Sequence, residues 1–197
     1  MGAEDSPRHP ALRDSRSVYG WTSILLHWVT AILVIALWFI GRSIAESGPE
    51  QSDSRRALHI SIAASAWALL LLRVIWRFRS GHPRIRGQSD LIHYVARTTH
   101  YTMLLVMVVM LLSGPFLVWS GGNSVIIFGA LSIPSPLGHV ESVSSLAWFI
   151  HSNAAMLLFW LVLLHIGGAL KHLMFHADDT FVRMIWPGKA GKDGATT

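Results

Sequence analysis

Histidine is the residue type in this chain that has the most chemistry to offer. There are 11 histidines in 197 residues and no cysteine. Without cysteine the chain cannot form disulfides, thiolate metal sites, iron–sulfur clusters or thioether-linked haem. Six histidines fall in or at the end of long apolar runs: His27, His59, His100, His151, His165 and His172. An ionisable side chain in such a run is costly and usually faces a cofactor or the interior of a helical bundle.

The most informative spacing joins His151 and His165, which lie 14 residues apart in one apolar run. On an α-helix with about 100° per residue, this spacing brings both side chains to nearly the same face, separated by ~21 Å along the axis. One helix could thus supply an axial ligand to each of two b-type haems stacked across a bilayer. Iron with two neutral imidazole ligands is six-coordinate, which suits electron transfer.

The histidines lie on four apolar stretches, which we expect to be membrane-spanning helices. These stretches are residues 21–41, 57–78, 99–119 and 146–173, and each is close to or above the roughly 20 residues that cross a bilayer. Apolar residues make up 52% of the chain and charged residues 14%, against about a quarter charged in soluble domains. The prediction is an all-α, integral membrane four-helix bundle over residues 19–186, in which Gly114-Pro115 kinks or ends the third helix.

Arginine and lysine residues are expected to set the orientation of the bundle. They are frequent in residues 1–18, between the second and third stretches, and near the C-terminus, whereas residues 120–145 contain none. Since such residues stay on the cytoplasmic side, we predict cytoplasmic N- and C-termini and an outer-face cap at residues 120–145. The net charge of +5 gathers at the ends of the apolar runs, so nucleic-acid binding is not expected. Residues 187–197 are predicted to be a disordered tail.

This orientation sorts the histidines by depth in the membrane. His27 and His165 fall toward the inner face, and His59 and His151 toward the outer face. We therefore predict that each pair binds the iron of one haem. Arg73, 14 residues after His59 and so on the same helix face, lies at the cytoplasmic end. A buried guanidinium needs an anionic partner, and the propionates of the inner haem would supply one.

Two further histidines are assigned to quinone binding or to contacts around the inner haem. His100 lies near the inner end of the third stretch and competes with His27 and His165 for the ligand role. His172, seven residues after His165, is assigned to a quinone or a proton-transfer step, the alternative being an exposed interfacial histidine. A lone intramembrane histidine can also simply hydrogen-bond a neighbouring helix, but four at two matched depths favour haem. A zinc site would need three or four ligands at one depth.

Several of these motifs together resemble the bacterial cytochrome b561 family. They are Leu26-His27-Trp28, Leu58-His59 followed by Arg73, His151 with His165, and the segment Phe175-His176-Ala177-Asp178-Asp179-Thr180. The resemblance covers roughly residues 17–187, and it extends more distantly to cytochrome b subunits of nickel hydrogenases and formate dehydrogenases. It implies a multi-pass protein of the bacterial inner membrane that has two b haems and exchanges electrons with ubiquinone.

One branch of that family oxidises superoxide at the periplasmic face and passes the electron to ubiquinone. In that branch, basic residues just before the outer ligand of the fourth helix help to attract the anion. Here the segment from Glu141 to His151 has no lysine or arginine. Attraction of superoxide would therefore depend on Arg42, Arg55 and Arg56, and the electron donor is left open between superoxide and a redox protein.

The expected function is transmembrane electron transfer by an oxidoreductase. Electrons enter at the outer haem and reduce quinone near His100, Arg73 and His172. A first alternative is a membrane anchor, in which the chain is the quinone-reactive cytochrome b subunit of a partner dehydrogenase or cytochrome. An alternative of a different class is a transporter that uses the histidines as metal ligands. A visible absorption spectrum separates the transporter from the two haem proteins, because only haem absorbs there.

Overall fold

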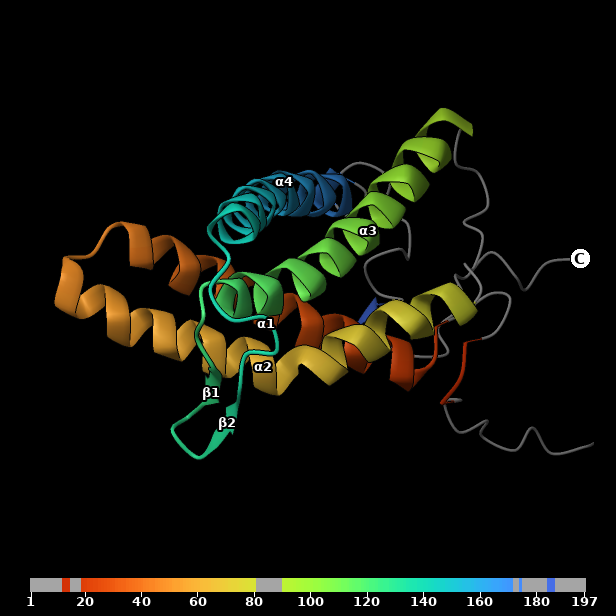
Figure 1. Cartoon of the computed structure of the whole chain (residues 1–197). Helices are drawn as coiled ribbons and strands as arrows, with labels where there is room; N and C mark the ends of the chain where they lie inside the picture. Colours follow the sequence, from red (N-terminus) through yellow and green to blue (C-terminus); the bar gives the residue numbers. More distant parts are fainter. Residues whose placement is uncertain (1–11, 15–18, 81–89, 172–173, 175–183, 187–197) are drawn as a thin grey trace, which may run out of the picture.

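Four long helices dominate the computed structural model, which describes residues 12–14, 19–80, 90–171, 174 and 184–186. They are α1 (Trp21–Ala45), α2 (Pro49–Arg79), α3 (Asp90–Ser120) and α4 (Glu141–Lys171), and two short strands, β1 (Val125–Ile127) and β2 (Leu131–Ile133), lie between α3 and α4 (Figure 1). Each helix is long and apolar enough to cross a membrane. The predicted four-helix integral membrane bundle is therefore confirmed, with a small β-hairpin added. The predicted tail at residues 187–197 lies outside the described residues.

The helices extend beyond the apolar stretches that predicted them. α1 continues four residues further, while α2 begins eight residues earlier and α3 nine residues earlier than expected. Hydropathy marks only the part of a helix that lies in lipid, whereas the backbone hydrogen bonds continue into polar turns. At the start of α2, Pro49 occupies the first turn, where the missing proline N–H costs no hydrogen bond.

Of the two alternatives for Gly114-Pro115, the one in which it ends α3 is wrong, because the helix continues to Ser120. Pro115 has no N–H, so the carbonyl oxygen of Leu111, one turn earlier, loses its usual donor. Nε1 of Trp67 on α2 donates a hydrogen bond of 2.9 Å to that oxygen. A side chain of the neighbouring helix thus replaces the missing backbone bond, which allows the helix to pass through the proline.

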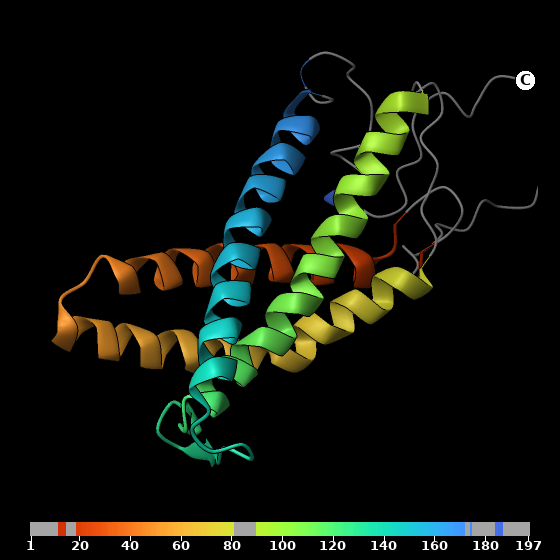
Figure 2. The same cartoon turned by 45° about the horizontal axis from the view of Figure 1, so that its top comes forward.

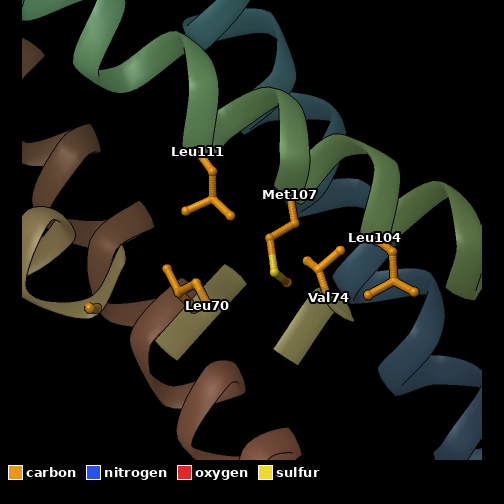
Figure 3. Close-up of a cluster of buried hydrophobic side chains, with 6 residues drawn as sticks. Leu70, Val74, Leu104, Met107 and Leu111 are labelled. Carbon is orange, nitrogen blue, oxygen red and sulfur yellow. The ribbon is translucent and has the colours of Figure 1, made fainter. Parts of the chain in front are cut away.

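The bundle consists of two helical hairpins. α1 packs along α2, and α3 packs along α4, and the two hairpins cross at a clear angle (Figure 2). They meet where α2 faces α3, in a core of buried side chains from Ala66, Leu70, Val74, Leu104, Met107 and Leu111 (Figure 3). These residues repeat every three or four positions, so each set forms one stripe on its helix. By contrast, α1 and α4 make almost no close backbone contact, which leaves space between the hairpins.

The connection between α3 and α4 folds back onto α2. β1 and β2 pair antiparallel, with Val125 opposite Ile133, and the turn between them contains Phe128 and Gly129, both at positive φ. Oγ of Ser61 on α2 accepts a bond of 2.9 Å from the N–H of Phe128 and donates one of 3.2 Å to the carbonyl oxygen of Ile126. The hairpin is therefore fixed to α2 one half-turn after His59.

Candidate functional site

Both histidines of α4 face a histidine of the α1–α2 hairpin. The ring of His165 lies 6.1 Å from the ring of His27 on α1, measured between centroids, with the planes at 69°. The ring of His151 lies 6.4 Å from the ring of His59 on α2, with the planes at 85°. Since the two α4 residues are 14 positions apart, the pairs are separated by ~21 Å along that helix. The structure thus brings together both predicted pairs.

The separation within each pair matches the size of one bound metal ion. A metal–imidazole nitrogen bond is about 2 Å long, and the ring centre lies about 1 Å beyond the nitrogen. Two imidazoles on opposite sides of a metal therefore have centroids roughly 6 Å apart. The observed 6.1 and 6.4 Å fit this arrangement, whereas two rings in direct hydrogen bond lie closer.

The number of ligands points to a metal that brings further ligands of its own. Among the described residues, no three His, Asp or Glu side chains come together in a group that could hold a metal ion. Two imidazoles alone do not complete a tetrahedral zinc site. Haem iron needs only two axial ligands from the protein, because the macrocycle supplies the other four.

The His59–His151 pair lies in the wall of a large cavity with a volume of about 1740 Å³. This volume exceeds the roughly 300–1,000 Å³ of ordinary small-molecule sites. Residues of all four helices and of the hairpin line it, mostly with apolar side chains. Nδ1 of His59 is buried and makes no hydrogen bond of good geometry with the described residues. The donor set and the space at this pair therefore fit a flat, largely apolar macrocycle.

Two glycines allow the rings of this pair to lie close to the helix backbones. A Cβ atom on Gly41 would lie 3.3 Å from Cε1 of His59, and one on Gly114 would lie 3.5 Å from Cε1 of His151. The sequence alone does not predict this role for either residue. At Gly167 and Gly168, next to His165, an added Cβ would meet nothing within 4 Å.

A signal for both glycines is present in the sequence. Gly41 follows His27 by 14 residues, and Gly114 follows His100 by 14. The same spacing joins His59 to Arg73 and His151 to His165. Each helix therefore carries one pair of positions that share a face at the two depths of the histidine pairs.

Charged and hydrogen-bonding groups surround the His27–His165 pair. Nη2 of Arg73 lies 3.4 Å from Nδ1 of His27, and Nη1 donates to the carbonyl oxygen of Ser23 at 3.4 Å. Oγ of Ser23 accepts a hydrogen bond of 2.8 Å from Nε1 of Trp76 and donates one of 2.7 Å to Oδ2 of Asp14. Arg73 is thus placed next to the predicted ligand at the predicted end of α2. His172 lies outside the described residues.

Helix α3 contacts both histidines of α4. Nε2 of His100 lies 3.2 Å from Nδ1 of His165, and Oγ of Ser113 lies 3.0 Å from Nδ1 of His151. The sequence predicts a contact of His100 around the inner haem, whereas it does not identify Ser113. Ser113 immediately precedes Gly114, which lies 14 residues after His100. The same spacing therefore indicates the part of α3 that contains Ser113.

A stacked aromatic pair joins α1 to α4 between the two histidine positions of α4. The rings of Trp38 and Phe159 are 4.2 Å apart and nearly parallel, at 11°. Phe159 lies eight residues after His151 and six before His165. The stack therefore crosses the space between α1 and α4 at a level between the two histidine pairs.

The fold and the paired histidines define a class, namely integral membrane four-helix proteins with paired imidazoles inside the bundle. The family model described as prokaryotic cytochrome b561 matches residues 18–187. The chain belongs to this family. It is therefore a multi-pass membrane cytochrome b of the bacterial inner membrane, which binds b-type haem and takes part in transmembrane electron transfer.

Individual relatives agree with the family model. Cytochrome b561 homolog 2 of Escherichia coli (strain K12) is 28% identical over 181 residues, which cover 89% of this chain and 94% of the relative. Cytochrome b561 homolog 1 of the same organism is 27% identical over 168 residues, covering 83% of this chain and 94% of the relative. The similarity thus extends over nearly the whole of both proteins.

Proposed function

We propose that this cytochrome b holds two b haems and carries electrons between a donor at the outer face and ubiquinone near the cytoplasmic face. In this proposal His59 and His151 bind the outer haem, and His27 and His165 bind the inner haem. The observation that carries it is the pair of ring separations, 6.1 and 6.4 Å, each the width of one metal between two imidazoles. When bound, haem supplies a one-electron iron couple.

Arg73 has two roles in this proposal. A histidine that binds iron through Nε2 carries its proton on Nδ1, so Nδ1 of His27 cannot then accept a hydrogen bond. The guanidinium that now lies 3.4 Å from that atom must turn away, and a propionate of the inner haem gives it an anionic partner. Its positive charge remains close to the inner iron.

The quinone site is proposed near the same end of the bundle, at His100 and His172. His100 touches the ring of His165, so a quinone beside it would lie close to the inner haem. Both histidines could exchange the protons that accompany quinone reduction.

Superoxide is a candidate donor at the other end, and a redox protein is the alternative. Arg42 and Arg56 line the cavity that contains His59 and His151. However, Arg42 is paired with Glu46 at 2.8 Å, and Arg56 with Asp53 at 3.5 Å. These carboxylates offset part of the charge that would attract an anion, which weakens the case for superoxide.

Haem content tests the proposal directly. The purified protein should have a b-type absorption spectrum with about two haems per chain. His59→Ala or His151→Ala should remove one haem and leave the other, and His27→Ala or His165→Ala should remove the second one. His139→Ala, which changes an exposed histidine of the connecting segment, is the matched control and should retain both. Loss of both haems from each single variant would contradict the assignment of the ligands to two separate sites. A wild type without haem would favour the transporter alternative.

The donor is tested by redox mixing. The purified, oxidised protein is mixed with superoxide and, separately, with quinol, and haem reduction is followed in the visible spectrum. Reduction by both supports a superoxide-to-quinone oxidoreductase, and reduction by quinol alone excludes superoxide as a donor. Copurification with a dehydrogenase or cytochrome would support the membrane-anchor alternative.

The orientation is proposed from the positive residues, with both termini in the cytoplasm, and it can be tested because the chain has no cysteine. Ser132→Cys in β2 should react with a membrane-impermeant maleimide from the outer side. Ser80→Cys at the end of α2 should react only after the membrane is opened. The reverse pattern would invert the proposed topology and exchange the inner and outer haems.

A further inference from the structure

Helix α3 supplies none of the four proposed iron ligands, yet it touches both ligands of α4. Oγ of Ser113 lies 3.0 Å from Nδ1 of His151, and Nε2 of His100 lies 3.2 Å from Nδ1 of His165. In both contacts the α4 imidazole uses Nδ1. The other ring nitrogen, Nε2, is left to coordinate a metal.

We infer that α3 sets the redox potential of each haem separately, through Ser113 for the outer haem and His100 for the inner haem. The inference rests on the proposed function, because it requires His151 and His165 to bind iron. Ligation fixes the direction of both hydrogen bonds. A neutral imidazole bound through Nε2 has its proton on Nδ1, so His151 and His165 donate and the α3 side chains accept.

The distances assign His100 to this role rather than to ligation opposite His165. Two nitrogens on opposite sides of one metal are about 4 Å apart. The 3.2 Å between His100 and His165 is instead a hydrogen-bond distance. Among the histidines that the structure describes near His165, the ring of His27, with its centroid 6.1 Å away, has the separation that a metal between them requires.

An acceptor at Nδ1 makes the imidazole a more basic ligand, which favours ferric over ferrous iron and lowers the potential. In the part of the chain that the structure describes, no side chain accepts a hydrogen bond from the proposed ligands of α1 and α2. Nδ1 of His27 faces the guanidinium of Arg73, which can only donate. The His59 ring lies beside the backbone carbonyl of Leu37, without a hydrogen bond of good geometry. Each proposed haem therefore has one ligand whose Nδ1 forms a hydrogen bond with a side chain of α3. Imidazole is a more basic acceptor than hydroxyl, so His100 should have the larger effect.

Four variants test this in the purified haem-loaded protein. Ser113→Ala and His100→Phe remove the acceptors, whereas Ser113→Thr and His100→Gln retain an oxygen that can accept. The two haems are followed separately in a redox titration, and the ferric forms are compared by electron paramagnetic resonance. Thr102→Ala removes a hydroxyl elsewhere on α3 and serves as the matched control. The haem that is lost in His151→Ala identifies which potential belongs to the outer site.

Ser113→Ala should raise the potential of the outer haem alone, and His100→Phe that of the inner haem alone. The expected change is up to about tenfold in the equilibrium constant of reduction, equivalent to ~59 mV for one electron. The Thr and Gln variants should lie close to the wild type. A merely structural role would not give a shift confined to one haem and reversed by a conservative substitution.

Unchanged potentials in both acceptor-free variants, or equal shifts of both haems, would overturn the inference while leaving the ligand assignment intact. If Ser113→Ala loses a haem, Ser113→Cys, a weaker acceptor of similar size, is titrated instead, and an unchanged outer potential then counts against the inference. If both haems survive in His151→Ala and in His165→Ala, the proposed function itself fails.

Discussion

Nε1 of Trp67 donates a 2.9 Å hydrogen bond to the carbonyl oxygen of Leu111, the oxygen that Pro115 leaves without a backbone donor. A side chain of α2 therefore supplies the hydrogen-bond donor that this carbonyl oxygen of α3 lacks, and lipid has no donor that could replace it. The contact lies four residues before Pro115 and two before Ser113, so it also supports the turn that touches His151.

Trp67→Phe should lower the melting temperature of the protein in detergent, because it leaves that carbonyl unpaired. The expected loss of stability is about 0.5–2 kcal/mol. In a Pro115→Ala background the new N–H of residue 115 can donate to Leu111, so the same substitution should cost clearly less. Trp148→Phe, at an exposed position of α4, is the control. Equal costs with and without the proline would show that the hydrogen bond does not compensate for it.

Gly41→Ala should disturb the His59–His151 site selectively. The added Cβ would lie 3.3 Å from Cε1 of His59, so the ring must move by a few tenths of an ångström. Altered absorption or reduced occupancy is expected for one haem only, and Gly41→Val should have a larger effect. Gly167→Ala, where a Cβ meets nothing within 4 Å, should leave both haems unchanged and can gain up to about 1 kcal/mol of helix propensity. Identical spectra for the three variants would show that close approach at Gly41 is not required.

Arg73→Gln should lower the potential of the inner haem and leave the outer one unchanged. Reduction adds negative charge to the site, and a nearby guanidinium stabilises that charge. The size of the shift, measured by redox titration, should be on the order of tenfold or less in the equilibrium constant. Arg79→Gln changes an exposed arginine at the end of the same helix and should shift neither haem. A shift of the outer haem in Arg73→Gln would contradict the placement of Arg73 at the His27 pair.

Phe159→Ala should weaken the junction between α1 and α4. It removes the ring that stacks 4.2 Å from Trp38, and aromatic pairs contribute about 0.5–1.5 kcal/mol beyond their buried area. The melting temperature in detergent should fall, and the fall should be smaller in a Trp38→Leu background, where the stack is already lost. Trp148→Leu, at an exposed position of the same helix, is the matched control. Strict additivity of the Phe159 and Trp38 effects would rule out a direct contribution of the stack.

The chain alone was enough to predict the four spans and to group His27 with His165 and His59 with His151 by their positions along those spans. The length of an apolar stretch indicates whether it can cross the bilayer, and a helix rises by a fixed distance per residue. The proximity of His27 to His165 and of His59 to His151 follows from these two facts, if successive helices cross the membrane in alternating directions. The same arithmetic applied to all four helices would also have found Gly41 and Gly114. The helix ends were predicted less well, because hydropathy does not report on the polar turns outside the bilayer.

Other features depend on how the helices are rotated and crossed, which no local pattern encodes. Ser113 is one of many serines in the chain, and only the packing of α3 against α4 places its oxygen at Nδ1 of His151. Likewise, nothing near Pro115 in the sequence indicates that Trp67, 48 residues earlier, completes the helix. The sequence by itself determined which residues lie at the same depth, since depth depends on one helix at a time. The tertiary structure alone decided which nitrogen of each histidine remains available and which side chain holds the other, because those are contacts between helices.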